Sequence, residues 1–79
     1  MRILEKWEHE SAQRRAKRIG QPVVVYTDEF MEYWDAGPVL RTQVRFCSLQ
    51  EYHDDIEQGA FISESSVVAI VDESGDLVG

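Results

Sequence analysis

Residues 27–38 read TDEFMEYWDAGP, and two local structures compete for them. As a helix, the stretch would begin at an N-cap, Thr27 or Asp28, and would end at Gly37. The apolar side chains that would then share one stripe are Phe30, Tyr33 and Trp34. As the arm of a β-hairpin, the stretch alternates poorly, because its aromatic residues fall on both faces. The pattern therefore favours a short helix over 28–36, with a hairpin arm as the alternative.

The flanking segments have the patterns of β-strands. Residues 21–27 (QPVVVYT) are apolar on both faces, as a central strand is. Residues 39–47 alternate cleanly, with Leu40, Thr42, Val44 and Phe46 on one face and Arg41, Gln43 and Arg45 on the other. The two arginines are expected to pair with nearby carboxylates. Residues 66–72 (SVVAIVD) predict a buried strand, with a turn at 73–76 and a short return strand at 77–78.

Two further helices complete the predicted order. Residues 2–18 contain no Gly or Pro, and Gly20 is a natural stop. The apolar stripe there is Ile3, Leu4 and Trp7, so the first half of the helix is expected to dock more firmly than the second. Ser48 and Glu51 form a capping box that starts a helix over 48–58, which Gly59 ends.

The predicted order is therefore α-β-α-β-α-β in a single domain, residues 1–79. We expect an α+β fold with about three helices on a small, mostly antiparallel sheet of about three strands. The predicted core residues are Phe30, Val44, Phe46, Tyr52, Ile56 and Ile70, with Phe61 and Ile62 as a plug in a connector.

Composition excludes several classes of protein. The 79 residues are 43% hydrophobic, which argues against disorder, and no apolar run approaches the roughly 20 residues of a membrane span. The N-terminus carries charges where a signal peptide needs an apolar stretch. Cys47 is the only cysteine, so a reducing cytoplasm is the expected location. The five glycines stand apart, so neither the P-loop nor the dinucleotide-binding spacing occurs.

The net charge of −7 is unevenly distributed. Residues 1–19 hold six bases and three acids, whereas residues 20–79 hold two bases and twelve acids. Carboxylates three or four residues apart on a helix are about 4.5–6 Å apart along its axis, comparable with the ~3.4 Å phosphate spacing of one DNA strand. Rows of acids could therefore imitate a phosphate backbone, or serve solubility alone. The candidate contact acids are Asp28, Glu29, Glu32, Asp35, Glu51, Asp54, Asp55 and Glu57.

Other chemistry-bearing residues have weaker patterns. The basic cluster Arg14, Arg15, Lys17 and Arg18 could contact phosphate, or could neutralise the acidic body. Cys47 precedes a helix N-terminus, which can lower a thiol pKa; the alternatives are a half-buried apolar role or an intermolecular disulfide. Two ligands on one short helix, such as His53 and Glu57, make no metal site. We therefore expect no metal, no cofactor and no catalytic constellation.

In size, charge and helix-and-sheet layout, the chain resembles small phage-encoded inhibitors, such as anti-CRISPR and anti-restriction proteins that act as DNA mimics. The resemblance rests on no specific motif and assigns no residues. It implies a non-catalytic inhibitor that binds a basic, nucleic-acid-binding protein or complex. The short apolar runs predict no membrane span, and the acidic body disfavours direct nucleic-acid binding. One alternative is a nucleic-acid-associated regulator that uses the basic N-terminal helix. The other is an assembly protein, a homodimer for example, with Trp7, Tyr33 or Trp34 in its interface.

Overall fold

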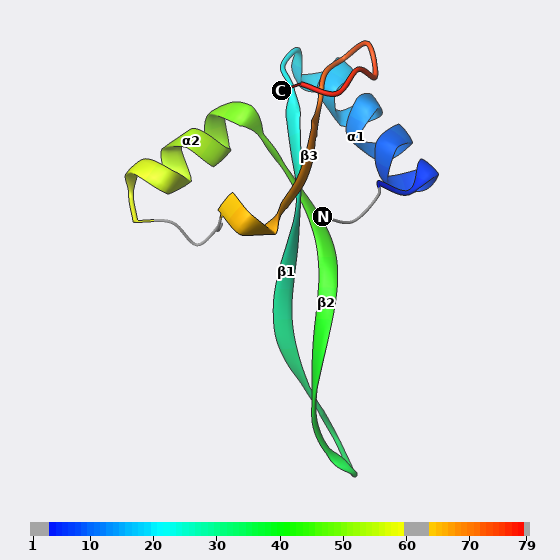
Figure 1. Ribbon diagram of the computed structural model, residues 1–79, viewed down its shortest axis with the longest axis vertical. Coiled ribbons are helices and arrows are strands. Elements are labelled where there is room, and N and C mark those ends of the chain that lie inside the picture. Colours follow the sequence, from blue (N-terminus) through cyan, green and yellow to red (C-terminus); the bar gives the residue numbers. More distant parts are fainter. Residues whose placement is uncertain (1–3, 60–63, 79) are drawn as a thin grey trace.

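The computed structural model describes residues 4–59 and 64–78. In these ranges the chain forms an α+β fold with two helices and a three-stranded antiparallel sheet of order β2-β1-β3 (Figure 1). The elements are α1 (Lys6–Ile19), β1 (Val23–Trp34), β2 (Gly37–Ser48), α2 (Leu49–Glu57), the 3-10 turn η1 (Glu64–Ser66) and β3 (Val67–Val71). The predicted fold class and antiparallel sheet are confirmed, but the prediction of three helices is wrong.

The helix predicted over 28–36 does not form: residues 28–34 are the second half of β1, and residues 35–36 are the turn of the hairpin. β1 pairs with β2 along its whole length, from Val23 opposite Ser48 to Trp34 opposite Gly37. Gly37, which the pattern assigned to a helix end, has a φ of +118° and follows the two-residue turn of the hairpin. Aromatic residues on both faces do not oppose a strand here, because this part of the ribbon is covered on neither face.

β3 is much shorter than its neighbour. It pairs with β1 only from Val23 to Tyr26, with an irregularity after Val25. The Thr27 hydroxyl then donates a hydrogen bond to the Ser66 carbonyl oxygen, 3.3 Å away. Beyond this point β1 and β2 continue as a two-stranded ribbon that projects from the rest of the molecule (Figure 1). We call residues 28–43 of this ribbon the β-arm.

The core lies where α1 crosses the base of the sheet. Ala12 and Ala16, both fully buried, pack against Val23, Val25 and Val71. Small side chains at i and i+4 allow the helix backbone to come close to the strands. Of the predicted stripe, Leu4 packs against this core, whereas Trp7 is 54% exposed and residue 3 lies outside the described ranges. The second half of the helix, expected to dock less firmly, supplies the fully buried Ala12 and Ala16.

The other predicted core residues have mixed outcomes. Val44 and Phe46 pack against the core at its edge, as expected. Phe30 does not, because it lies on the β-arm, beyond the reach of α1 and β3. Tyr52, Ile56 and Ile70 are half-buried. Residues 61 and 62, the expected plug, lie outside the described ranges.

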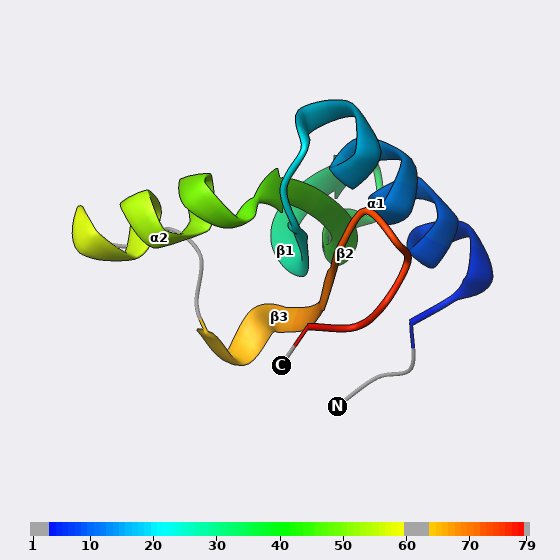
Figure 2. The ribbon, with the colours of Figure 1, turned by 90° about the horizontal axis from the view of Figure 1, so that it is seen from above.

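The predicted capping box starts α2. The Glu51 amide donates to Ser48 Oγ at 3.1 Å, and the Ser48 amide donates to a Glu51 carboxylate oxygen at 3.4 Å. α2 leaves the end of β2 and extends away from the hairpin on the side opposite α1 (Figures 1 and 2). Most of its surface is therefore open to solvent.

The chain returns to the core after β3. Asp72 Oδ1 accepts hydrogen bonds from the amides of Ser74 and Asp76, both 2.9 Å long, which closes the predicted turn. The predicted return strand is reduced to one bridge, Leu77 opposite Val71. No helix in the described ranges is long and apolar enough to cross a membrane.

Candidate functional site

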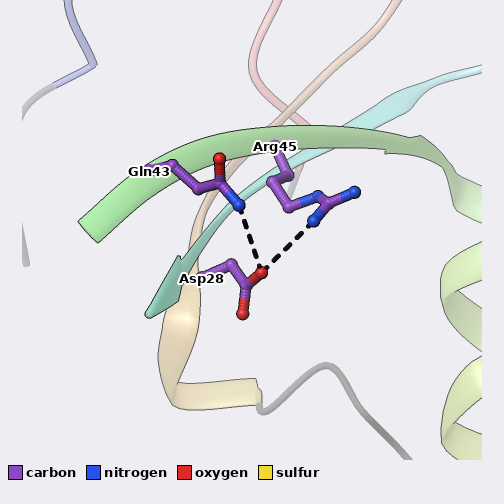
Figure 3. Close-up of polar contacts among 3 residues, drawn as sticks. All are labelled: Asp28, Gln43 and Arg45. Carbon is purple, nitrogen blue, oxygen red and sulfur yellow. Dashed lines mark hydrogen bonds and ion pairs between the residues drawn. The ribbon is translucent and has the colours of Figure 1, made fainter. Parts of the chain in front are cut away.

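Two of the four carboxylates of the β-arm, Asp28 and Glu32, are paired with arginines of the neighbouring strand. Asp28 accepts from Gln43 Nε2 at 3.4 Å and from Arg45 Nη1 at 3.3 Å (Figure 3). Glu32 forms an ion pair with Arg41 Nε at 3.2 Å. The prediction that these two arginines pair with nearby carboxylates is therefore confirmed.

The strand geometry removes the first predicted row of acids. Successive residues of a strand point to opposite faces, so Glu29 lies on the face opposite Asp28 and Glu32. Four residues of strand span about 13 Å, whereas four residues of helix span about 6 Å. Asp28 and Glu32 are therefore too far apart to imitate neighbouring phosphates, and Asp35 lies in the hairpin turn.

The second row of acids remains on a helix. Glu51, Asp54 and Glu57 are exposed on α2, and none of them forms an ion pair with another residue of the described ranges. Asp54 accepts a hydrogen bond from the Gln50 side chain at 3.0 Å. Asp55 differs from the other three, because it is half-buried against the sheet. There its charge adds slightly to the rise in the pKa of Tyr26 that burial causes.

The basic cluster of α1 faces solvent. Arg14, Arg15, Lys17 and Arg18 are all exposed. The Arg15 guanidinium lies over the Phe46 ring, with its central carbon 4.8 Å from the ring centroid, a cation–π contact. Arg15 and Arg18 also line a shallow hollow of about 140 Å³ with Phe46, Cys47 and Glu51. The cluster thus lies beside the start of α2.

Cys47 is half-buried in the wall of this hollow. Burial raises the pKa of its thiol to about 11, and the carboxylates of Glu51 and Asp55 contribute to the rise. Burial therefore outweighs the lowering that a helix N-terminus can cause, and the half-buried position agrees with the apolar role named as an alternative above. The described residues include no cluster of three or more His, Cys, Asp and Glu side chains that could hold a metal ion.

Large apolar side chains of the β-arm form an exposed surface that the sequence analysis did not single out as one site. Tyr33 is 83% exposed, and its neighbours on both strands are open as well. The members of this surface are Phe30, Met31, Tyr33, Trp34, Val39 and Leu40. The signal was present in the sequence, since aromatic residues on both faces of a strand imply that neither face is reserved for the core.

The fold and these surfaces define a small α+β protein with a projecting β-hairpin, an acidic helix and a basic helix. No family model matches the chain, and no curated protein or solved structure is significantly similar to it.

Proposed function

We propose that this chain is a non-catalytic interaction protein whose α2 surface binds a protein partner with a basic surface. The observation that carries the proposal is the contrast between two sets of acids. On the β-arm, Asp28 and Glu32 are neutralised by arginines within the chain. On α2, Glu51, Asp54 and Glu57 have no ion-pair partner among the described residues, so their charge is available to another molecule.

Electrostatics support this partner class. The nine residues of α2 carry four carboxylates and neither lysine nor arginine. A cluster of this kind attracts cationic surfaces within a Debye length, about 8 Å at physiological salt, and increases the rate of association. α2 projects away from the sheet (Figure 2), and the side chains of Glu51, Asp54 and Glu57 are exposed on it.

In a narrower form, the partner is a nucleic-acid-binding complex and the chain is its inhibitor, as the resemblance to phage-encoded DNA mimics implies. The carboxylates of α2 would then occupy positions that phosphate oxygens take in the partner's basic groove. Only α2 supports this version, because the β-arm lacks helical spacing and its acids are partly neutralised.

The test is a pull-down from a nuclease-treated bacterial lysate with the wild type and two double variants. Asp54→Lys with Glu57→Lys reverses two exposed charges that lie three residues apart on α2. Glu73→Lys with Asp76→Lys makes the same change at the C-terminal turn. We expect the α2 variant to lose a basic partner that the control retains. If both variants retain the same partner, or if the wild type captures none, α2 is a solvated surface and the proposal is wrong.

A second candidate is phosphate binding by α1. It is favoured by the exposure of Arg14, Lys17 and Arg18, none of which forms an ion pair within the described ranges. Salt-dependent binding of duplex DNA, lost in the Arg14→Glu and Arg18→Glu double variant, would support this candidate. Absence of binding at low salt would exclude it.

A further inference from the structure

We propose that the β-arm is a dimerisation element that pairs with the β-arm of a second copy of this chain. The two β1 strands would meet edge to edge and antiparallel, with Met31 of one copy opposite Met31 of the other. This inference rests on the β-arm and is independent of the proposed role of α2.

The edge of β1 beyond Tyr26 has no strand beside it within the described ranges, because β3 pairs no further along. Residues 28–34 of β1 are therefore bonded to β2 on one side and pair with no strand of the described ranges on the other. A two-stranded ribbon is at best marginally stable in water, and an open edge is a template for another strand. Because the arm projects clear of the core, a further strand beside β1 would stabilise it.

The side chains of this segment are suited to burial rather than to solvent. Phe30, Met31, Tyr33 and Trp34 occupy four of the seven positions from 28 to 34, and all four are exposed in the single chain. Aromatic and long apolar side chains favour strands because they pack against neighbours on an adjacent strand. A second β1 strand would supply those neighbours on the open side.

The outer edge of β2 is less suitable along the same arm. Pro38 lies near its tip and has no amide to donate, and proline is a residue with which proteins protect sheet edges from association. After Pro38, β2 has two exposed apolar residues, Val39 and Leu40, followed by the polar residues Arg41, Thr42 and Gln43, whereas four of the seven residues from 28 to 34 in β1 are large and apolar. The open edge of β1 is thus the more apolar of the two and carries no proline.

The distribution of charge selects one register for the pairing. With Met31 opposite its copy, Asp28 lies opposite Trp34, Glu29 opposite Tyr33, and Phe30 opposite Glu32. No two carboxylates then face each other directly. A shift of one or two residues in either direction places two carboxylates opposite each other, which destabilises a strand pair. The acids at 28, 29, 32 and 35 thus favour the register centred on Met31 and disfavour the registers shifted from it by one or two residues.

Backbone geometry permits the same register. Because a two-residue turn joins Trp34 to Gly37, even-numbered residues of the arm in β1 direct their amides and carbonyls toward β2. Those of Glu29, Met31 and Tyr33 face the open edge. In the proposed pairing Thr27 falls opposite the turn residue Asp35, so the partner's strand residues 28–34 end before Tyr26, where the pairing with β3 begins. The open segment therefore accommodates one partner strand between β3 and the turn.

Position-specific cross-linking tests the register, in a Cys47→Ser background. Cα atoms of a hydrogen-bonded antiparallel pair are about 5.5 Å apart, within the range of a disulfide. Met31→Cys alone should therefore oxidise to a covalent dimer. Glu29→Cys alone should not, because the two equivalent positions are about 13 Å apart along the strands. A mixture of Glu29→Cys and Tyr33→Cys should form the heterodimer. If Glu29→Cys dimerises as readily as Met31→Cys, the register is wrong.

The mass of the native chain tests the association itself, by sedimentation over a wide concentration range. We expect twice the mass of one chain at high concentration. Met31→Lys places two ammonium groups opposite each other at the symmetry axis. We expect it to raise the dissociation constant of the dimer at least about tenfold. Thr42→Lys, an equivalent change at an exposed position of β2, should leave the dimer intact. A monomeric wild type at every concentration, or equal effects of the two lysines, would overturn the proposal.

Discussion

The imidazole of His9, in the second turn of α1, is hydrogen-bonded through Nε2 to the carbonyl oxygen of Gly75, 66 residues further along the chain. This contact joins the helix to the turn that follows β3. Gly75 also lies against Gln13, one helical turn after His9 on α1. A Cβ added at Gly75 would lie 2.9 Å from the Gln13 side chain. The end of the chain is thus held against α1, which covers the core.

Replacement of His9 should therefore loosen the C-terminal turn. We expect His9→Ala to lower the free energy of unfolding by about 1 kcal/mol, the net value of one hydrogen bond. Amide exchange at residues 74–78 should rise at the same time. His53→Ala removes the exposed imidazole of α2 and is the matched control. Equal losses of stability in the two variants would mean that the contact with Gly75 contributes nothing.

Enlargement of the helix–sheet contact should be costly. Ala12 and Ala16 are fully buried against three valines, so Ala12→Leu has no free space to occupy. We expect a loss of about 1–3 kcal/mol in the free energy of unfolding, measured by urea denaturation. Lys17→Leu adds a similar side chain to the exposed side of α1 and should change stability by less than about 0.5 kcal/mol. A neutral Ala12→Leu would show that α1 is not closely packed on the sheet.

Gly37 should be needed for the turn of the β-arm. Its φ of +118° is strained for an L-residue, and nothing within 4 Å would contact an added Cβ, so the cost of alanine lies in the backbone alone. We expect Gly37→Ala to destabilise the arm by about 1 kcal/mol or more, detected as a change in the NMR signal of the Trp34 indole. A synthetic chain with D-alanine at position 37 favours positive φ and should retain the native signal. Equal signals for the two alanines would contradict this account.

The Cys47 thiol should react slowly with alkylating agents. Since its pKa is about 11, little thiolate exists near neutral pH, and alkylation at pH 8 should be at least about tenfold slower than for the unfolded chain. Because the thiolate is the reactive form, the rate should rise with pH up to about 11 rather than level off near the ordinary thiol pKa of about 8.5. Glu51→Gln removes one cause of the shift and should accelerate the reaction. A plateau near pH 9 would show that the thiol is unperturbed.

The sequence predicted those parts of the fold that depend on local chemistry. The capping box of Ser48 and Glu51 marks the start of α2 because both bonds join residues three apart. Gly20 ends α1 in the left-handed conformation, and its amide donates to the Ala16 carbonyl only four residues back, so this signal is local as well. The sequence predicted that Arg45 pairs with a carboxylate, since arginines on one face of a strand need counter-charges nearby, but it did not identify Asp28 as the partner.

The candidate site was predicted in part. The acids of α2 were identified correctly as a helical row, apart from Asp55, which turns toward the sheet. The acids at 28–35 were assigned to a helix that does not exist. The pKa of Cys47 also could not be read from its position before a helix, because burial outweighs the helix N-terminus.

What the sequence determined by itself was the class of the fold, the start of α2, the end of α1 and the apolar strand cores, since these depend on propensity and on contacts within a few residues. Only the tertiary structure decided that residues 28–34 form a strand and that Ala12 and Ala16 form the docked stripe. The local sequence of residues 28–34 distinguishes only weakly between helix and strand. Their pairing with residues 37–43 therefore decides that they form a strand. Alanine carries almost no hydrophobic signal, and it becomes the contact because only a small side chain lets α1 approach the sheet.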